Sequence, residues 1–214
     1  MTTLTPKLRR PKLSQAIRDD LGNSDLVEQD ALELGWYQDA KGNLAMPYNN
    51  GSGLVRTRFT VPQLIERNGK QSFLRYLQPR GTPPELYLPT IGDFDWGEVK
   101  VDASIRLYIT EGEKKSAIAC KRGLPCIGLS GVDSWSRKGG IPLPQWDEFD
   151  FNDREVVIAF DSDIADKPAV KSAERRLAQM LNSRKAKVYR LRMSEEIITG
   201  FDDFMNSTHS KGSK

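Results

Sequence analysis

Acidic residues in this chain stand at the ends of two short apolar segments. Glu111 follows the apolar run 105–110, and Asp161 and Asp163 follow the run 154–160. Because the side-chain period of a strand is two, an Asp-x-Asp sequence that leaves a strand presents both carboxylates on the same face. If the two runs are neighbouring parallel strands, the three carboxylates converge at one edge of the sheet, where ligands bind in such folds.

Carboxylates gathered in a small volume repel one another, and a divalent cation usually offsets that repulsion. Their hard oxygen ligands suit Mg²⁺ or Mn²⁺, which retain water and complete their shell with substrate phosphates. An isolated Asp-x-Asp is more typical of a solvated loop with helix-capping aspartates, and the Glu-Gly at another strand end is what favours a metal site. Asp202 and Asp203 are either further ligands or a turn followed by a helix N-cap.

The chain has too few cysteine and histidine residues for a zinc site. Cys120 and Cys126 are the only cysteines and His209 is the only histidine, whereas a structural zinc site needs about four such ligands. The sequence therefore predicts no zinc. Both cysteines flank apolar segments and are expected to be small core residues. An enzyme built from this chain would have to use carboxylates and basic residues.

The C-terminal half alternates short apolar runs with amphipathic helical patterns, which predicts an α/β fold with a parallel sheet covered on both faces. Asp166 is expected to cap a helix with Pro168 in its first turn and a buried stripe of Val170, Ala173, Leu177, Met180 and Leu181. Strands are expected over residues 105–110, 125–129, 154–160 and 187–191, with a helix running through Ala119 and Cys120.

The N-terminal half predicts a small, mostly antiparallel α+β unit. A helix capped by Ser24 or Asp25 is expected to run to about Leu34, with Gly35 as its stop. Short strands are expected over residues 44–48, 53–60, 73–77 and 85–88. The chain then divides into a polar arm (1–23), this basic unit (24–102), a catalytic domain (103–206) and a polar tail (207–214).

Composition adds only broad limits. The hydrophobic fraction is 38% and the net charge is +3, which permits binding to nucleic acid without requiring it. No run approaches the roughly 18 apolar residues that span a bilayer, and the basic N-terminus lacks the apolar core of a signal peptide. We expect a cytoplasmic protein without a membrane partner.

Basic residues are concentrated between positions 56 and 80, where Glu66 is the single acid among Arg56, Arg58, Arg67, Lys70, Arg75 and Arg80. The aromatic residues Phe59, Phe73 and Tyr76 are interleaved with them. This pattern fits a groove that follows a single-stranded backbone and offers rings for base stacking. The alternative is a solvated face of a small sheet.

Several ordered motifs between residues 105 and 205 together resemble a Toprim domain, and more narrowly the Toprim-like domain in replication proteins of phages, plasmids and other mobile elements. The segments before them are similar, more loosely, to the basic subdomain of DnaG-type primases. The motifs are Thr110-Glu111-Gly112-Glu113-Lys114-Lys115, Ile127-Gly128-Leu129-Ser130-Gly131-Val132, Phe160-Asp161-Ser162-Asp163 and Phe201-Asp202-Asp203-Phe204, preceded by Met46-Pro47-Tyr48, Arg56-Thr57-Arg58-Phe59 and Arg75-Tyr76-Leu77.

The resemblance implies a Mg²⁺-dependent primase, a nucleotidyltransferase acting on a single-stranded DNA template and nucleoside triphosphates, with a replicative helicase or another replication protein as partner. It assigns Glu111 to acid/base work or metal binding and Asp161 and Asp163 to the metal. Asp202 and Asp203 would complete the acidic cluster. It also implies nucleic-acid or nucleotide contacts for Arg56, Arg58, Arg75, Tyr76, Lys114 and Lys115.

The chain departs from the family four residues beyond the glutamate, where Lys115 replaces an acid. Either Glu113 compensates, or a single metal site remains, or Lys114 and Lys115 meet the triphosphate. The leading hypothesis is a primase. A Toprim nuclease and a non-catalytic module that binds DNA or recruits a helicase are the alternatives, and Lys115 is the feature that favours the module.

Overall fold

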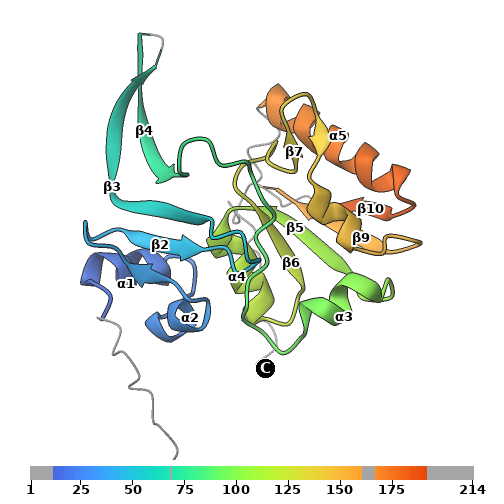
Figure 1. Cartoon of the computed structure of the whole chain (residues 1–214), viewed down its shortest axis with the longest axis horizontal. Helices are drawn as coiled ribbons and strands as arrows, with labels where there is room; N and C mark the ends of the chain where they lie inside the picture. Colours follow the sequence, from blue (N-terminus) through green and yellow to red (C-terminus); the bar gives the residue numbers. More distant parts are fainter. Residues whose placement is uncertain (1–11, 68, 161–166, 192–214) are drawn as a thin grey trace, which may run out of the picture.

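The computed structural model describes residues 12–67, 69–160 and 167–191, which form two four-stranded sheets joined through helix α4 (Figure 1). Within those ranges, none of the helices has the length and apolar character needed to cross a lipid bilayer. The chain is mixed α/β: an antiparallel sheet with two short helices comes first, and a parallel sheet with flanking helices follows.

The first sheet has the order β1-β2-β3-β4 and is antiparallel throughout, as the turn-rich pattern predicts. Its strands are β1 (Tyr37–Gln38), β2 (Leu44–Pro47), β3 (Val55–Arg67) and β4 (Lys70–Leu77). β3 is longer than the expected strand 53–60 and pairs with β4 in a hairpin that projects from the body of the protein (Figure 1).

Helices α1 (Gln15–Gly22) and α2 (Glu28–Glu33) support this sheet. The expected polar arm over residues 1–23 is wrong for the part of it that the structure describes from Leu13 onward, because Leu13, Ile17 and Leu21 are buried. Their spacing of four residues is the helical signal that the polar composition concealed. α2 also starts later than expected, at Glu28, with Val27 rather than Ser24 or Asp25 as its N-cap.

The second sheet has the order β10-β9-β5-β6 and is parallel throughout, which confirms the predicted parallel α/β unit. Its strands are β5 (Leu107–Glu111), β6 (Cys126–Leu129), β9 (Glu155–Ala159) and β10 (Lys187–Arg190). β5 lies between β6 and β9, with Thr110 opposite Gly128 on one side and Ala159 on the other.

Helices cover both faces of the parallel sheet. The buried residues of α4 (Glu113–Lys121) belong to the core cluster that contains α1 and Trp36, whereas those of α5 (Pro168–Ser183) and α3 (Trp96–Val101) belong to the other cluster. Strand residues alternate between the two clusters, as a sheet buried on both faces requires. Cys120 and Cys126 are free and buried, as expected.

The predicted stripe of α5 is largely confirmed, since Ala173, Leu177, Met180 and Leu181 are buried and Val170 is partly buried. Its N-cap is Lys167; Asp166, the expected cap, lies outside the described residues.

Short elements complete the chain between the sheets and after β6. The expected strand 85–88 is reduced to one antiparallel bridge, in which Tyr87 meets Gly128 beside the edge of β6. A small hairpin of β7 (Ser136–Arg137) and β8 (Ile141–Pro142) leads to the 3-10 helix η1 (Pro144–Glu148). Tyr87 is fully buried and its hydroxyl accepts a hydrogen bond from Trp36 at 2.9 Å. Buried side chains thus join the two sheets. The expected domain boundary at residue 102 therefore does not separate two independent cores.

Candidate functional site

The carboxyl edge of the parallel sheet carries Glu111 at the point where the strand order reverses. β5 is followed along the chain by β6 on one side, and β9 and β10 follow on the other. In open sheets of this kind, ligands bind beyond the carboxyl ends of the two central strands, because the connecting helices leave those ends uncovered. Glu111 is the last residue of β5, and β9 ends beside it at Ala159. The two strands are neighbours, which is the condition under which the sequence predicts that the carboxylates converge.

The expected aspartates continue directly from this edge in the sequence. Phe160, which follows β9, is buried, and Asp161 comes next along the chain. Asp161 and Asp163 lie outside the described residues, as do Asp202 and Asp203. Their assignment to a metal site stays a prediction.

A cavity of about 620 Å³ opens at this edge, between the parallel sheet and the β3–β4 hairpin. It brings together six of the residues expected at the site: Arg58, Arg75, Tyr76, Glu111, Lys114 and Lys115. Ser24, Gly112, Val132, Lys167 and Val170 complete its lining, and none of these five was expected at the site. Residues more than 130 positions apart in the sequence therefore share one cavity.

The described lining of this cavity is strongly basic. Glu111 is its single described carboxylate, against the cationic side chains Arg58, Arg75, Lys114, Lys115 and Lys167. Cations that converge from four separate segments raise the local concentration of anions and suit phosphate groups in particular. The lining favours a phosphorylated ligand.

Asp20 of α1 holds two of these cations in place. Arg58 donates to its carboxylate through Nε at 2.6 Å, and Lys114 Nζ donates to its backbone carbonyl at 2.7 Å and lies 3.3 Å from its Oδ2. Although burial raises the pKa of Asp20, the hydrogen bond from Arg58 and the charges of Lys114 and Arg58 outweigh it and lower the pKa below 3.8. α1, which the sequence pattern did not predict, thus positions Arg58 and Lys114 at the cavity.

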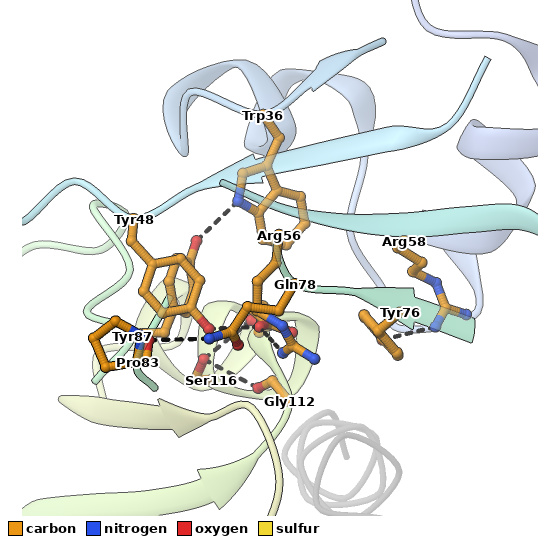
Figure 2. A network of polar contacts seen from close by, with 11 residues as sticks. Trp36, Tyr48, Arg56, Arg58, Tyr76, Gln78, Pro83, Tyr87, Gly112 and Ser116 are labelled. Carbon is orange, nitrogen blue, oxygen red and sulfur yellow. Dashed lines mark hydrogen bonds and ion pairs between the residues drawn. The ribbon is translucent and has the colours of Figure 1, made fainter. Parts of the chain in front are cut away.

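Tyr76 lies against two arginines. Its ring centroid is 5.1 Å from the Arg56 guanidinium carbon and 4.9 Å from that of Arg58, both within cation–π range. Its hydroxyl accepts a hydrogen bond from Arg58 Nη1 at 2.7 Å (Figure 2). Burial raises the pKa of Tyr76 to about 12, against the opposing charge of Arg58, so the phenol stays protonated at neutral pH. The ring is fixed at the cavity wall.

Arg56 does not belong to the exposed surface. Only 7% of the residue is exposed, and Nη1 forms a hydrogen-bonded ion pair with Glu113 Oε1, which also accepts from the Tyr48 hydroxyl at 2.7 Å. Figure 2 shows Arg56 and Tyr48 turned toward the start of α4 near Gly112 and Ser116. The expected contact between Arg56 and nucleic acid is not compatible with this burial. The sequence pattern does not distinguish the buried Arg56 from Arg58, because the two arginines are two residues apart on β3 and share a face of the strand.

The ion pair of Arg56 with Glu113 decides whether Glu113 can compensate for the acid that Lys115 replaces. Glu113 is 1% exposed, faces Arg56 and Tyr48, and does not line the cavity. It therefore cannot compensate for the acid that Lys115 replaces. Lys115 lines the cavity together with Glu111, which leaves a single metal site or a contact with phosphate as the remaining interpretations.

The turn between β5 and α4 requires glycine at position 112. Gly112 has φ 97° and ψ 146°, a backbone conformation that side chains with a Cβ rarely adopt. It is the N-cap of α4, and an added Cβ would meet no atom within 4 Å. The start of α4, with its positive dipole end, is therefore open beside Lys115 and Glu111 and reinforces the preference for anions.

The described residues do not by themselves form a metal site, since they contain no group of three acidic, histidine or cysteine side chains that could hold a metal ion together. Glu111 offers one oxygen-donor side chain at the reversal point. A Mg²⁺ or Mn²⁺ ion here would need Asp161 and Asp163 in addition, and these residue types fit such an ion because they supply hard oxygen ligands.

A larger cavity of about 780 Å³ lies in another part of the protein, lined mainly by residues 83–96 and η1. Two of its charged side chains, Lys100 and Glu148, neutralise each other in an ion pair at 2.7 Å. It contains neither Glu111 nor the basic cluster. We therefore assign the candidate site to the smaller cavity, which lies where a parallel sheet binds its ligands.

Comparison with known protein families finds a match for the second half of the chain. Residues 95–211 match DUF3854, a domain of unknown function, over more than half of the sequence. The chain belongs to the DUF3854 family. The match begins at the N-cap of α3 and contains Glu111, Asp161, Asp163, Asp202 and Asp203, whereas Arg58, Arg75 and Tyr76 lie before it. No curated protein and no solved structure matches the chain.

Proposed function

We propose that this protein is a Toprim-type nucleotidyltransferase that makes short primers on single-stranded DNA during replication of a phage, plasmid or other mobile element. The observation that carries the proposal is the position of Glu111 at the strand-order reversal, in one cavity with five cationic side chains from both halves of the chain. Its substrates would be nucleoside triphosphates and the template, and its partner a replicative helicase or another replication protein.

The reaction assigns a role to each wall of the cavity. The 3′ hydroxyl of the growing primer attacks the α-phosphorus, a new P–O bond forms, and the bond to pyrophosphate breaks. Glu111 accepts the proton that the hydroxyl loses, as a general base within reach of the reacting atoms. Lys115 and Arg75 hold phosphate oxygens and offset their charge. Asp161 and Asp163, with Asp202 and Asp203, would hold Mg²⁺, which when bound supplies charge stabilisation at the transferred phosphoryl group.

A non-catalytic module is the second candidate, and Lys115 favours it. A lysine in place of an acid makes the cavity more cationic and removes one metal ligand, which suits binding of nucleic acid without chemistry. In that case loss of Glu111 would leave the affinity for DNA unchanged, whereas loss of Arg75 would lower it.

Primer synthesis on single-stranded DNA, with nucleoside triphosphates and Mg²⁺ or Mn²⁺, tests the proposal. We expect labelled products that Glu111→Ala reduces by at least about 100-fold, the usual contribution of a general base. Glu98→Ala, which removes an exposed carboxylate of α3, is the matched control and should leave synthesis intact. Shortened DNA strands would identify a nuclease instead. Full binding of DNA without any product would identify the binding module.

A further inference from the structure

The β3–β4 hairpin extends beyond the cavity and has an irregular register. Arg58 pairs with Tyr76, but the next pair is Gln63 with Leu74, so β3 uses three more residues than β4 between them. Such a bulge bends a hairpin and increases its twist. The part beyond it, Gln63–Arg67 and Lys70–Leu74 by sequence, projects from the body of the protein (Figure 1).

Large apolar side chains are exposed on this hairpin. Leu64 is 57% exposed and Phe73 is 70% exposed, and the two residues pair directly across the strands, so their side chains lie on one face. Val61 and Leu77 on the same hairpin are also exposed. A two-stranded hairpin gains little stability from solvent-exposed apolar residues. An exposed apolar patch surrounded by polar residues typically marks a binding surface.

This face is continuous with the cavity. Phe73, Arg75 and Leu77 alternate along β4 and therefore share one side of the strand. Arg75 lies between the two apolar residues and also lines the cavity that contains Glu111. A ligand that leaves the cavity past Arg75 would next meet Phe73.

The charges around the patch favour a polyanion over a protein. Lys70, Arg75 and Arg80 are exposed on or beside β4, and Glu66 is the one acid between residues 56 and 80. Exposed rings interleaved with cations are the recurring surface for single strands, because each base offers a face for stacking and each phosphate offers a charge. An apolar partner protein would gain nothing from this excess of positive charge.

We propose that the outer face of the β3–β4 hairpin is a stacking platform for a single-stranded nucleic acid outside the cavity. A base stacks on Phe73 with Leu64 beside it, and Arg75, on the same side of β4, contacts a flanking phosphate. The inference rests on the proposed function only in taking the same single strand as ligand, and it requires no chemistry. The strand is held at two places, the basic cavity and the projecting hairpin.

Binding in the presence of EDTA tests this platform separately from catalysis. Fluorescence anisotropy with a labelled oligothymidine of about 20 nucleotides covers a site of the usual size for such proteins. Phe73→Ala should weaken binding roughly tenfold, the effect of losing one stacked base, and Phe73→Trp should retain it. Tyr189→Ala removes an exposed ring from β10 and is the matched control. Unchanged thermal melting would show that each variant is folded.

The salt dependence separates stacking from charge. Arg75→Gln should lower the slope of log affinity against log salt by about one unit, whereas Phe73→Ala should leave the slope unchanged. Wild-type affinity in Phe73→Ala would overturn the inference and leave the hairpin face to a protein partner. Equal affinity for a duplex of the same length would also overturn it, since paired bases cannot stack on the ring.

Primer synthesis by the wild type, measured beside these binding assays, keeps the two proposals apart. Loss of binding in Phe73→Ala without any primer synthesis by the wild type would support the platform and refute the primase. Primer synthesis with normal binding by Phe73→Ala would do the reverse.

Discussion

Arg56 of β3 and Glu113 in the first turn of α4 form a buried ion pair that joins the antiparallel sheet to the parallel one. The side chains are 8% and 1% exposed, and Tyr48 donates the second hydrogen bond to the carboxylate. Arg56 Nε and Glu113 Oε2 have no hydrogen-bond partner among the described residues. The pair fixes the hairpin that carries Arg58, Arg75 and Tyr76 over the end of β5.

Removing one partner of this pair should be strongly destabilising. Glu113→Ala leaves the Arg56 guanidinium buried without its counter-charge, and we expect the free energy of unfolding to fall by about 3–5 kcal/mol. Urea unfolding followed by circular dichroism measures the change. A double variant with leucine at both positions should recover much of the loss, because it buries no charge.

The exposed pair of Arg106 and Glu155 provides the control. Arg106 Nη2 and Glu155 Oε2 are 2.5 Å apart, but the two side chains are 54% and 39% exposed. Glu155→Ala should therefore change the free energy of unfolding by less than about 1 kcal/mol. Similar effects at the buried and exposed pairs would contradict the structural role that we give to Arg56.

Asp20 should make stability depend on pH in the acid range. Its pKa in the folded protein is below its ordinary value of 3.8, so its contribution is present above that value and is lost as the pH falls through the folded pKa. The difference in urea midpoint between the wild type and Asp20→Asn should be largest near neutral pH and should shrink as the pH falls below 3.8. A difference that stays constant across this range would mean that the charge of Asp20 is not the cause.

Gly112 should be intolerant of a side chain for conformational reasons alone. An alanine Cβ would meet no atom within 4 Å, but φ 97° lies where only glycine is relaxed, so Gly112→Ala should cost about 1–3 kcal/mol of unfolding free energy. Gly22→Ala is the matched control, because Gly22 has equally open space and no positive φ. We expect that change to be neutral or stabilising by up to about 1 kcal/mol. Equal costs at both positions would disprove the argument from backbone strain.

Lys115 should act on nucleotide binding. If its ammonium holds a phosphate, Lys115→Gln should raise KM for nucleoside triphosphates roughly tenfold, the cost of one charge-assisted hydrogen bond, with a smaller effect on kcat. Lys138→Gln removes an exposed lysine between β7 and β8 and should leave both constants unchanged. A fall in kcat at constant KM would instead place Lys115 at the reacting phosphoryl group.

Much of the parallel unit follows from local pattern. Short apolar runs separated by helical segments predict β5, α4, β6, β9, α5 and β10 to within a few residues, because burial on both faces requires continuous apolar strands. The Glu-Gly after the first run predicts Glu111 at the strand end, where the structure has it. α1 escaped prediction because its two buried residues, Ile17 and Leu21, are surrounded by polar ones.

The sequence by itself predicted the residue types of the candidate site: carboxylates after two strands, and basic residues before them. Only the tertiary structure decided which basic residues are available to a ligand. Arg56 and Arg58 are two residues apart on one strand, yet the partner of Arg56 is 57 positions away in α4 and that of Arg58 is 38 positions away in α1. Whether a charge is used for folding or for binding depends on contacts between distant segments, and no local pattern contains that information.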